Sequence, residues 1–148
     1  MANETTPVGN RQYLTDMDVR IWLRDNNPEA NLLLDDYEFT PEEIRTAMTL
    51  AVDHYNDIPP SMMLPLDYTQ FPWRSKLLCG TVANLLFMAA HRFRRNSLKY
   101  TAGGMTIADQ EKFDQYDAAG GRLWEEFKEW AALHKRSMNA EQGFGILT

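Results

Sequence analysis

The sequence of 148 residues contains a single cysteine, Cys79, which excludes an intrachain disulfide and any metal site built from several cysteines. One free thiol is compatible with a reducing cytoplasm. Long apolar runs are also missing, because the uncharged stretch Leu77 to Ala90 is shorter than the roughly 20 residues that span a bilayer. The N-terminal segment MANETTPVGNRQY has no apolar core, so we expect no signal peptide and no membrane anchor.

Recognisable catalytic motifs are absent as well. The chain contains no GxSxG elbow, Walker loop or dinucleotide-binding glycine pattern. Its histidines lie on three different predicted helices and outside HExxH or ExxH patterns, which favours core, cap or surface roles: His54, His91 and His134. Cys79 has apolar neighbours, which favour an inert thiol. Three carboxylates are expected to lie on a solvated helix face: Glu125, Glu126 and Glu129. We therefore expect no enzymatic activity, no metal and no cofactor.

Charge is unevenly distributed along the chain, although the net charge is only −6. Residues 1–72 carry 4 basic and 13 acidic side chains, residues 73–100 carry 6 basic and none acidic, and residues 101–148 carry 5 basic and 8 acidic. The acidic flanks are expected to pair with the basic middle, either within one subunit or between neighbouring subunits. A general nucleic-acid binder is less expected, because such proteins usually present a net basic face.

The basic segment also contains the most apolar part of the chain, and Trp73 to Asn96 is predicted to form one buried central helix. Its apolar residues recur at steps of one, three and four, as on a broad helix face: Leu77, Leu78, Val82, Leu85, Leu86, Ala89 and Phe93. We expect the rest of the fold to wrap around this helix.

Two helices are predicted before the central one, each from a capping signal. Thr40 is an N-cap, Pro41 takes the first helical position and Glu43 completes a capping box, so Thr40 to Asn56 is predicted to be an amphipathic helix. Thr15 is an N-cap for a short earlier helix. The apolar face of that earlier helix is predicted to be formed by Val19, Trp22 and Leu23.

The connecting segments are less regular. Asn31 to Phe39 is interpreted as a short helical turn, with a brief extended segment as the alternative. Asp57 to Pro72 contains four prolines, which exclude a regular helix, and several large apolar side chains. We therefore predict an ordered crossover that packs on the fold or on a partner.

A last helix is predicted from Ile107 to about Arg136, with Gly120 and Gly121 in its middle. This glycine pair indicates a kink, a close approach of another backbone at Gly120, or a break into two helices. The fold class is thus all-α, a small bundle of about four main helices. Residues 1–12 are predicted to be a flexible arm, 13–136 a single helical domain and 137–148 an extended tail. The apolar end of that tail is a candidate for docking in a groove or adding a strand to a partner.

One polar feature stands above the background, a basic cluster at the end of the central helix. It comprises His91, Arg92, Arg94, Arg95 and Lys99. Arginines so closely spaced are suited to phosphate contacts. The reading that we favour is that they pair with acidic groups of the N-terminal half or of a neighbouring subunit, and also stabilise the helix C-terminus.

Several stretches together resemble the small helical head–tail connector (adaptor or neck) proteins of tailed bacteriophages. They are DVRIWLRD, EFTPEEIRTAMTLAVDHYND followed by IPP, the apolar helix ending HRFRRNS, YTAGGMTIADQEKFDQY, and the GFG of the tail. The resemblance covers most of residues 17–145 and is one of layout and residue character. A small helical DNA-binding or regulatory protein that uses residues 91–99 is the alternative.

The resemblance implies a structural virion protein without enzymatic activity. Such proteins form rings, commonly of twelve copies, between the portal protein and the next neck or tail protein, and genomic DNA passes through the ring. The protein would be made in the host cytoplasm and end in the virion neck, without a membrane. Subunit or portal contacts would involve Gly143, Phe144, Gly145, Ile146 and Leu147. Subunit pairing or DNA contact would involve Arg92, Arg94, Arg95 and Lys99.

Overall fold

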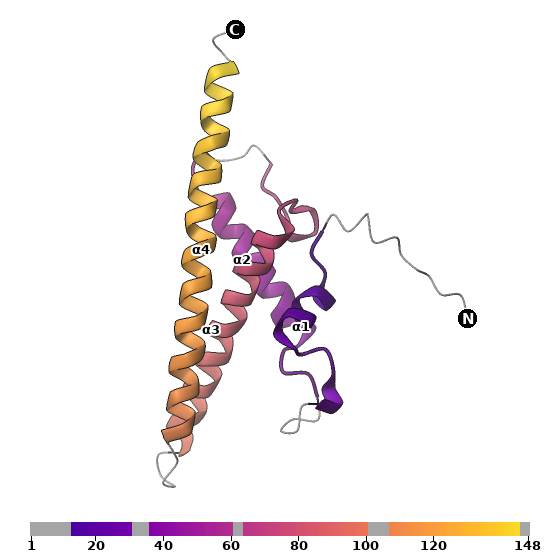
Figure 1. The fold of residues 1–148 in the computed structure, drawn as a ribbon, viewed down its shortest axis with the longest axis vertical. Helices are drawn as coiled ribbons and strands as arrows, with labels where there is room; N and C mark the ends of the chain where they lie inside the picture. The colour runs from indigo at the N-terminus through magenta and orange to yellow at the C-terminus, as the bar shows by residue number, and fades with distance from the viewer. Residues whose placement is uncertain (1–12, 31–35, 61–63, 101–106, 146–148) are drawn as a thin grey trace, which may run out of the picture.

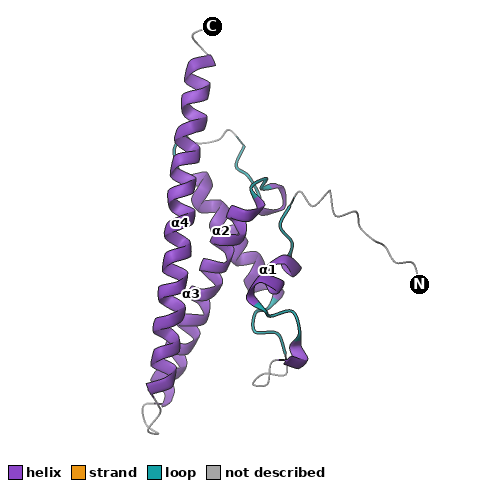
Figure 2. Ribbon diagram, viewed as in Figure 1, coloured by secondary structure: helices purple, strands orange, loops and turns teal. Residues whose placement is uncertain are grey.

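The computed structural model describes residues 13–30, 36–60, 64–100 and 107–145, and this part of the chain folds into helices without any strand (Figures 1 and 2). The helices are α1 (Asp16–Leu23), α2 (Pro41–Asp57), α3 (Arg74–Tyr100) and α4 (Ile107–Gly145). Two short 3-10 turns lie between them, η1 (Pro28–Ala30) and η2 (Tyr68–Gln70). The predicted all-α bundle of about four main helices is confirmed. The arm predicted for residues 1–12 lies outside the described residues.

The long helices α3 and α4 lie side by side, and α2 packs against α3 (Figure 1). Helix α2 begins as predicted, because Thr40 Oγ1 accepts a hydrogen bond from the Glu43 amide at 3.2 Å and Glu43 Oε2 accepts one from the Thr40 amide at 2.8 Å. The predicted amphipathic character is confirmed, because the apolar residues at steps of three and four along α2 are buried: Ile44, Ala47, Met48, Ala51, Val52 and Tyr55. Helix α1 begins with the same arrangement, formed by Thr15 and Asp18.

Two glycines allow the three longer helices to approach closely. A Cβ atom on Gly80 would lie 2.9 Å from Ala51 Cβ of α2 and 3.0 Å from the ring of Phe127 in α4. A Cβ on Gly120 would lie 3.2 Å from the carbonyl oxygen of Ala83 in α3. The close backbone approach predicted at Gly120 is therefore confirmed, whereas the alternative of a break into two helices is wrong because α4 is continuous.

The crossover between α2 and α3 is ordered where the structure describes it, as predicted. Phe71 is fully buried, and Asn56 anchors the crossover by exchanging two hydrogen bonds with the backbone of Leu66, at 2.8 and 3.1 Å. Phe71 joins an aromatic cluster with side chains from α2, from the residue just before α3 and from α4. That cluster also contains Tyr55, Trp73, Trp130 and His134. The apolar residues of the crossover are not all buried, since Leu64 is exposed.

Both long helices continue beyond their predicted ends. Helix α3 reaches Tyr100 and α4 reaches Gly145, so the prediction of an extended tail from Ser137 is wrong as far as residue 145. Tertiary contacts hold α4 against the rest of the fold on both sides of Arg136. Buried Lys135 donates a hydrogen bond to the Pro60 carbonyl at 3.1 Å. Tyr55 Oη donates another to Met138 Sδ at 3.6 Å. Glycine costs a helix only about 1 kcal/mol against alanine, so Gly143 does not by itself end α4.

In the N-terminal half, the structure differs from the apolar face predicted for α1 and leaves most of the predicted turn at Asn31 to Phe39 outside the described residues. Trp22 was assigned to the apolar face of α1, but its side chain is 53% exposed, and Arg20 is buried instead. Arg20 is buried because it forms hydrogen bonds with two polar groups inside the fold. The spacing of apolar residues along the sequence cannot predict such contacts. The helical turn predicted at Asn31 to Phe39 lies mostly outside the described residues, since 31–35 are not among them.

Candidate interaction surfaces

The segregated charges of the sequence meet within one chain. Arg74 of α3 pairs with Asp18 of α1 at 2.7 Å, and Lys76 pairs with Glu126 of α4 at 3.5 Å. Burial alone would raise the pKa of Asp18, but hydrogen bonds from Thr15 and the charge of Arg74 together lower it below its ordinary value. Of the two arrangements predicted from the charge pattern, pairing within one subunit is therefore present.

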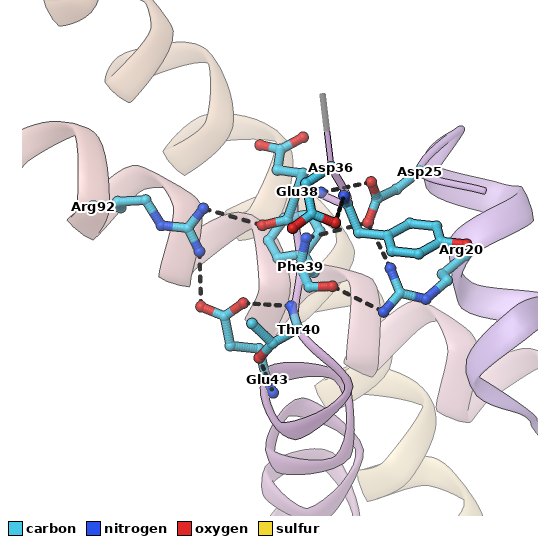
Figure 3. Close-up of polar contacts among 9 residues, drawn as sticks. Arg20, Asp25, Asp36, Glu38, Phe39, Thr40, Glu43 and Arg92 are labelled. Carbon is cyan, nitrogen blue, oxygen red and sulfur yellow. Dashed lines mark hydrogen bonds and ion pairs between the residues drawn. The ribbon is translucent and has the colours of Figure 1, made fainter. Parts of the chain in front are cut away.

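Arg92 of the basic cluster belongs to this internal pairing (Figure 3). One of its nitrogens lies 2.7 Å from Glu43 Oε1, and another donates a hydrogen bond to the Glu38 carbonyl at 3.2 Å. Because Glu43 is also part of the α2 capping box, Arg92 ties α3 to the start of α2. Burial and the neighbouring Asp25 carboxylate raise the pKa of Glu38, although the charge of Arg92 opposes this shift.

A second arginine, Arg20 of α1, contacts the same backbone segment, which comprises residues 38 and 39 (Figure 3). Buried Arg20 pairs with Asp25 at 2.9 Å and donates a hydrogen bond to the Phe39 carbonyl at 2.9 Å. Asp25 in turn accepts hydrogen bonds from the amides of Glu38 and Phe39, at 2.7 and 3.2 Å. No motif in the sequence indicated this network, because Asp25 stands among the polar residues at the end of α1.

The other members of the basic cluster lie in the C-terminal half of α3. Arg94 is exposed and its guanidinium lies 5.7 Å from the ring centre of Phe113. His91 and Arg95 are exposed, and Lys99 lies in the last turn of α3. The structure thus divides the described part of the predicted cluster into Arg92, which ties α3 to α2, and the exposed His91, Arg94 and Arg95, which form a candidate contact surface.

An apolar groove runs along the N-terminal half of α3, between α1 and α4. It consists of two adjoining cavities of about 650 Å³ and about 210 Å³, which share Ser75 and Leu78. Its apolar lining comprises Leu14, Trp22, Pro72, Trp73, Leu78, Val82, Leu123 and Trp130. The charged residues on its rim include the two ion pairs Arg74–Asp18 and Lys76–Glu126. We call this feature the α3 groove; the sequence did not indicate it, because its lining comes from three helices and the crossover.

Burial is the main cause of the pKa shifts among the titratable side chains of the described core. His134 Nδ1 lies 2.8 Å from Tyr55 Oη, and burial raises the pKa of Tyr55 to about 12 while it lowers the pKa of Lys135. Burial lowers the pKa of His134 as well. Cys79 donates a hydrogen bond to the Leu123 carbonyl at 3.2 Å, and burial raises the pKa of its thiol, which disfavours the nucleophilic thiolate.

Within the described ranges, no three histidine, cysteine, aspartate or glutamate side chains are placed to hold a metal ion. In the same part of the chain, none of the helices combines the length and apolarity that crossing a membrane requires.

The predicted C-terminal contact residues fall at the end of α4. Gly143, Phe144 and Gly145 lie in its last turn, and Ile146 and Leu147 lie outside the described residues. The end of α4 extends beyond the rest of the bundle (Figure 1). A comparison of the chain with known protein families, curated proteins and solved structures finds no match.

Proposed function

We propose that this chain is a structural subunit of the neck of a tailed bacteriophage. It forms a ring that joins the portal protein to the next neck or tail protein and lets DNA pass. The observation that carries the proposal is the pairing of two assembly features, a long helix that extends beyond the body and an open apolar groove. An isolated subunit leaves both exposed, whereas an assembly covers them.

The internal ion pairs support apolar rather than electrostatic assembly contacts. Arg74, Lys76 and Arg92 each have an acidic partner in the same chain, so these cations do not need a neighbouring subunit for neutralisation. A heterologous contact between two different apolar surfaces generates a ring when its rotation closes. In this proposal the protein has no enzymatic activity, and its place is the virion.

The alternative function is DNA binding by the C-terminal part of α3, residues 91–99. Its support is the exposure of His91 and Arg95 on α3 and of Lys112 on α4, whose ammonium lies 5.8 Å from the ring centre of Phe93 in α3. Arg92 does not contribute to such a surface, because it is engaged with Glu43 and Glu38. The arginines of the cluster that such a surface would use are the adjacent and exposed Arg94 and Arg95.

The test is the mass of the purified protein by light scattering, alone and mixed with a candidate portal protein. A ring, or a monomer that joins the portal in a fixed stoichiometry, supports the connector function. A monomer that ignores the portal but binds duplex DNA with a strong dependence on salt supports the alternative. Replacing both Arg94 and Arg95 with glutamate separates the two roles further. If they face DNA in the ring, DNA retention is impaired while the ring still forms.

A further inference from the structure

Several side chains between Leu133 and Glu141 of α4 are exposed. Leu133 is 63% exposed, and residues 139–141 are exposed as well. The last described contact of α4 with the body is at Met138. Positions 133, 140 and 144 follow one another along one edge of the helix, given about 3.6 residues per turn. This exposed edge is therefore available to a partner surface.

The α3 groove of the same chain is out of reach of this end. Trp130 of α4 itself lines the groove, and Gly145 lies further along the same continuous helix. At 1.5 Å per residue, the two positions are separated by about 22 Å along the axis. An α-helix cannot turn back over such a distance without a break, and α4 has none.

We propose that the end of α4 from one copy of this chain occupies the α3 groove of a second copy, and so forms the contact that closes the ring. This inference rests on the proposed ring function and names the subunit interface within it. The contact is heterologous, because the two surfaces lie at different places on the molecule, and repetition generates a ring rather than a closed dimer.

The electrostatic character of the two surfaces favours a second copy. After Arg136, the described part of α4 has one charged residue, Glu141. The cations on the groove rim already have partners, since Arg74 pairs with Asp18 and Lys76 with Glu126. A weakly charged segment therefore meets an apolar groove whose flanking cations are already paired.

The first experiment compares two exposed leucines in the full-length protein. Leu133→Glu places a charge on the α4 edge, and Leu50→Glu is the matched control, because Leu50 is exposed on α2 and does not line the groove. Both variants should melt like the wild type by circular dichroism. We expect Leu133→Glu to weaken assembly at least about tenfold, as one buried charge does at an interface, and Leu50→Glu to leave it unchanged.

The second experiment traps the contact by cysteine cross-linking in a Cys79→Ala background. Ser75→Cys places a thiol in the groove, and Ala140→Cys places one at the α4 end. Oxidation of the assembled double variant should give a ladder of covalent oligomers. A mixture of the two single variants should give heterodimers and stop there, because each copy then has only one reactive position.

The outcomes separate the interface from the function. A ring that is indifferent to Leu133→Glu and gives no cross-link between positions 75 and 140 overturns the interface but leaves the ring intact. Cross-linking that stops at dimers in the double variant indicates an isologous contact and also overturns it. A protein that stays monomeric, with and without portal, overturns both the interface and the proposed function.

Discussion

Arg92 and Arg95 lie one turn apart on α3, but they differ in their surroundings. Arg92 contacts the Glu43 carboxylate and the Glu38 carbonyl, whereas Arg95 is exposed. We predict that Arg92→Met lowers the free energy of unfolding by about 1 kcal/mol, because it removes a partly buried ion pair and a charged hydrogen bond. Arg95→Met should change the free energy by less than about 0.5 kcal/mol. Urea denaturation measures both, and equal losses would show that Arg92 does not hold α2 to α3.

Two partly buried histidines make the stability depend on pH. Burial lowers the pKa of His54 and of His134 below the ordinary value of 6.5, and the charges of Lys128 and Lys135 respectively add to this effect, which Glu141 opposes at His134. The unfolded chain therefore binds these protons more readily than the folded one. Stability is fully present above pH 6.5 and is lost as pH falls towards the folded pKa values.

Chemical denaturation between about pH 8 and about pH 5.5, above the range in which carboxylates titrate, should detect this loss. We predict that His134→Gln and His54→Gln each flatten the profile and that the double variant flattens it most. A double variant whose profile remains parallel to that of the wild type would show that these imidazoles do not set the pH dependence.

The adjacent glycines Gly120 and Gly121 of α4 allow a controlled comparison of how closely α3 and α4 pack. A Cβ on Gly121 meets nothing within 4 Å, so Gly121→Ala should stabilise the protein by up to about 1 kcal/mol through helix propensity. A Cβ on Gly120 would lie 3.2 Å from the Ala83 carbonyl oxygen and 3.1 Å from the Phe87 ring, so α3 and α4 must separate slightly.

We therefore expect Gly120→Ala to be less stable than Gly121→Ala by about 2 kcal/mol, because strain in a packed helix interface opposes the gain in propensity. Thermal or urea denaturation of the two variants checks the difference. If both substitutions stabilise the protein equally, α3 and α4 are not in close contact at this position.

The predictable elements were those with local signals. The capping box of Thr40 and Glu43 and the apolar stripe that follows it determined α2, and the steps of three and four determined α3. Features that depend on contacts between distant parts of the chain could not be predicted from the sequence. Arg20 is buried because Asp25 pairs with it and the Phe39 carbonyl accepts a hydrogen bond from it. Helix α4 contacts the body at Lys135 and Met138, close to the end that the sequence predicted. The α3 groove belongs to the same class, since no single segment forms it.

At the scale of the whole molecule, the charge pattern has one consequence for assembly. A basic helix between acidic flanks suggested pairing either within a subunit or between subunits, and the structure contains the former in Arg74–Asp18, Lys76–Glu126 and Arg92–Glu43. These pairs bring α1, α2 and α4 onto α3. The lining of the α3 groove is mostly apolar and the cations on its rim are paired, so in the proposed ring we expect assembly through this groove to depend only weakly on salt.

The last prediction separates the folding of one subunit from its assembly. A chain that ends after Met138 keeps the described contacts between α4 and the body, including those of His134 and Lys135 with Tyr55 and Pro60. Its free energy of unfolding should therefore stay within about 0.5 kcal/mol of the full-length value.

A chain that ends after Ala131 loses those contacts and should lose at least about 2 kcal/mol, because it leaves the aromatic cluster around Tyr55 open to water. In light scattering, the chain ending after Met138 should remain a folded monomer where the full-length protein assembles, since it lacks the segment that we place in the neighbouring groove. Assembly of this truncated chain at full-length affinity would require a different interface.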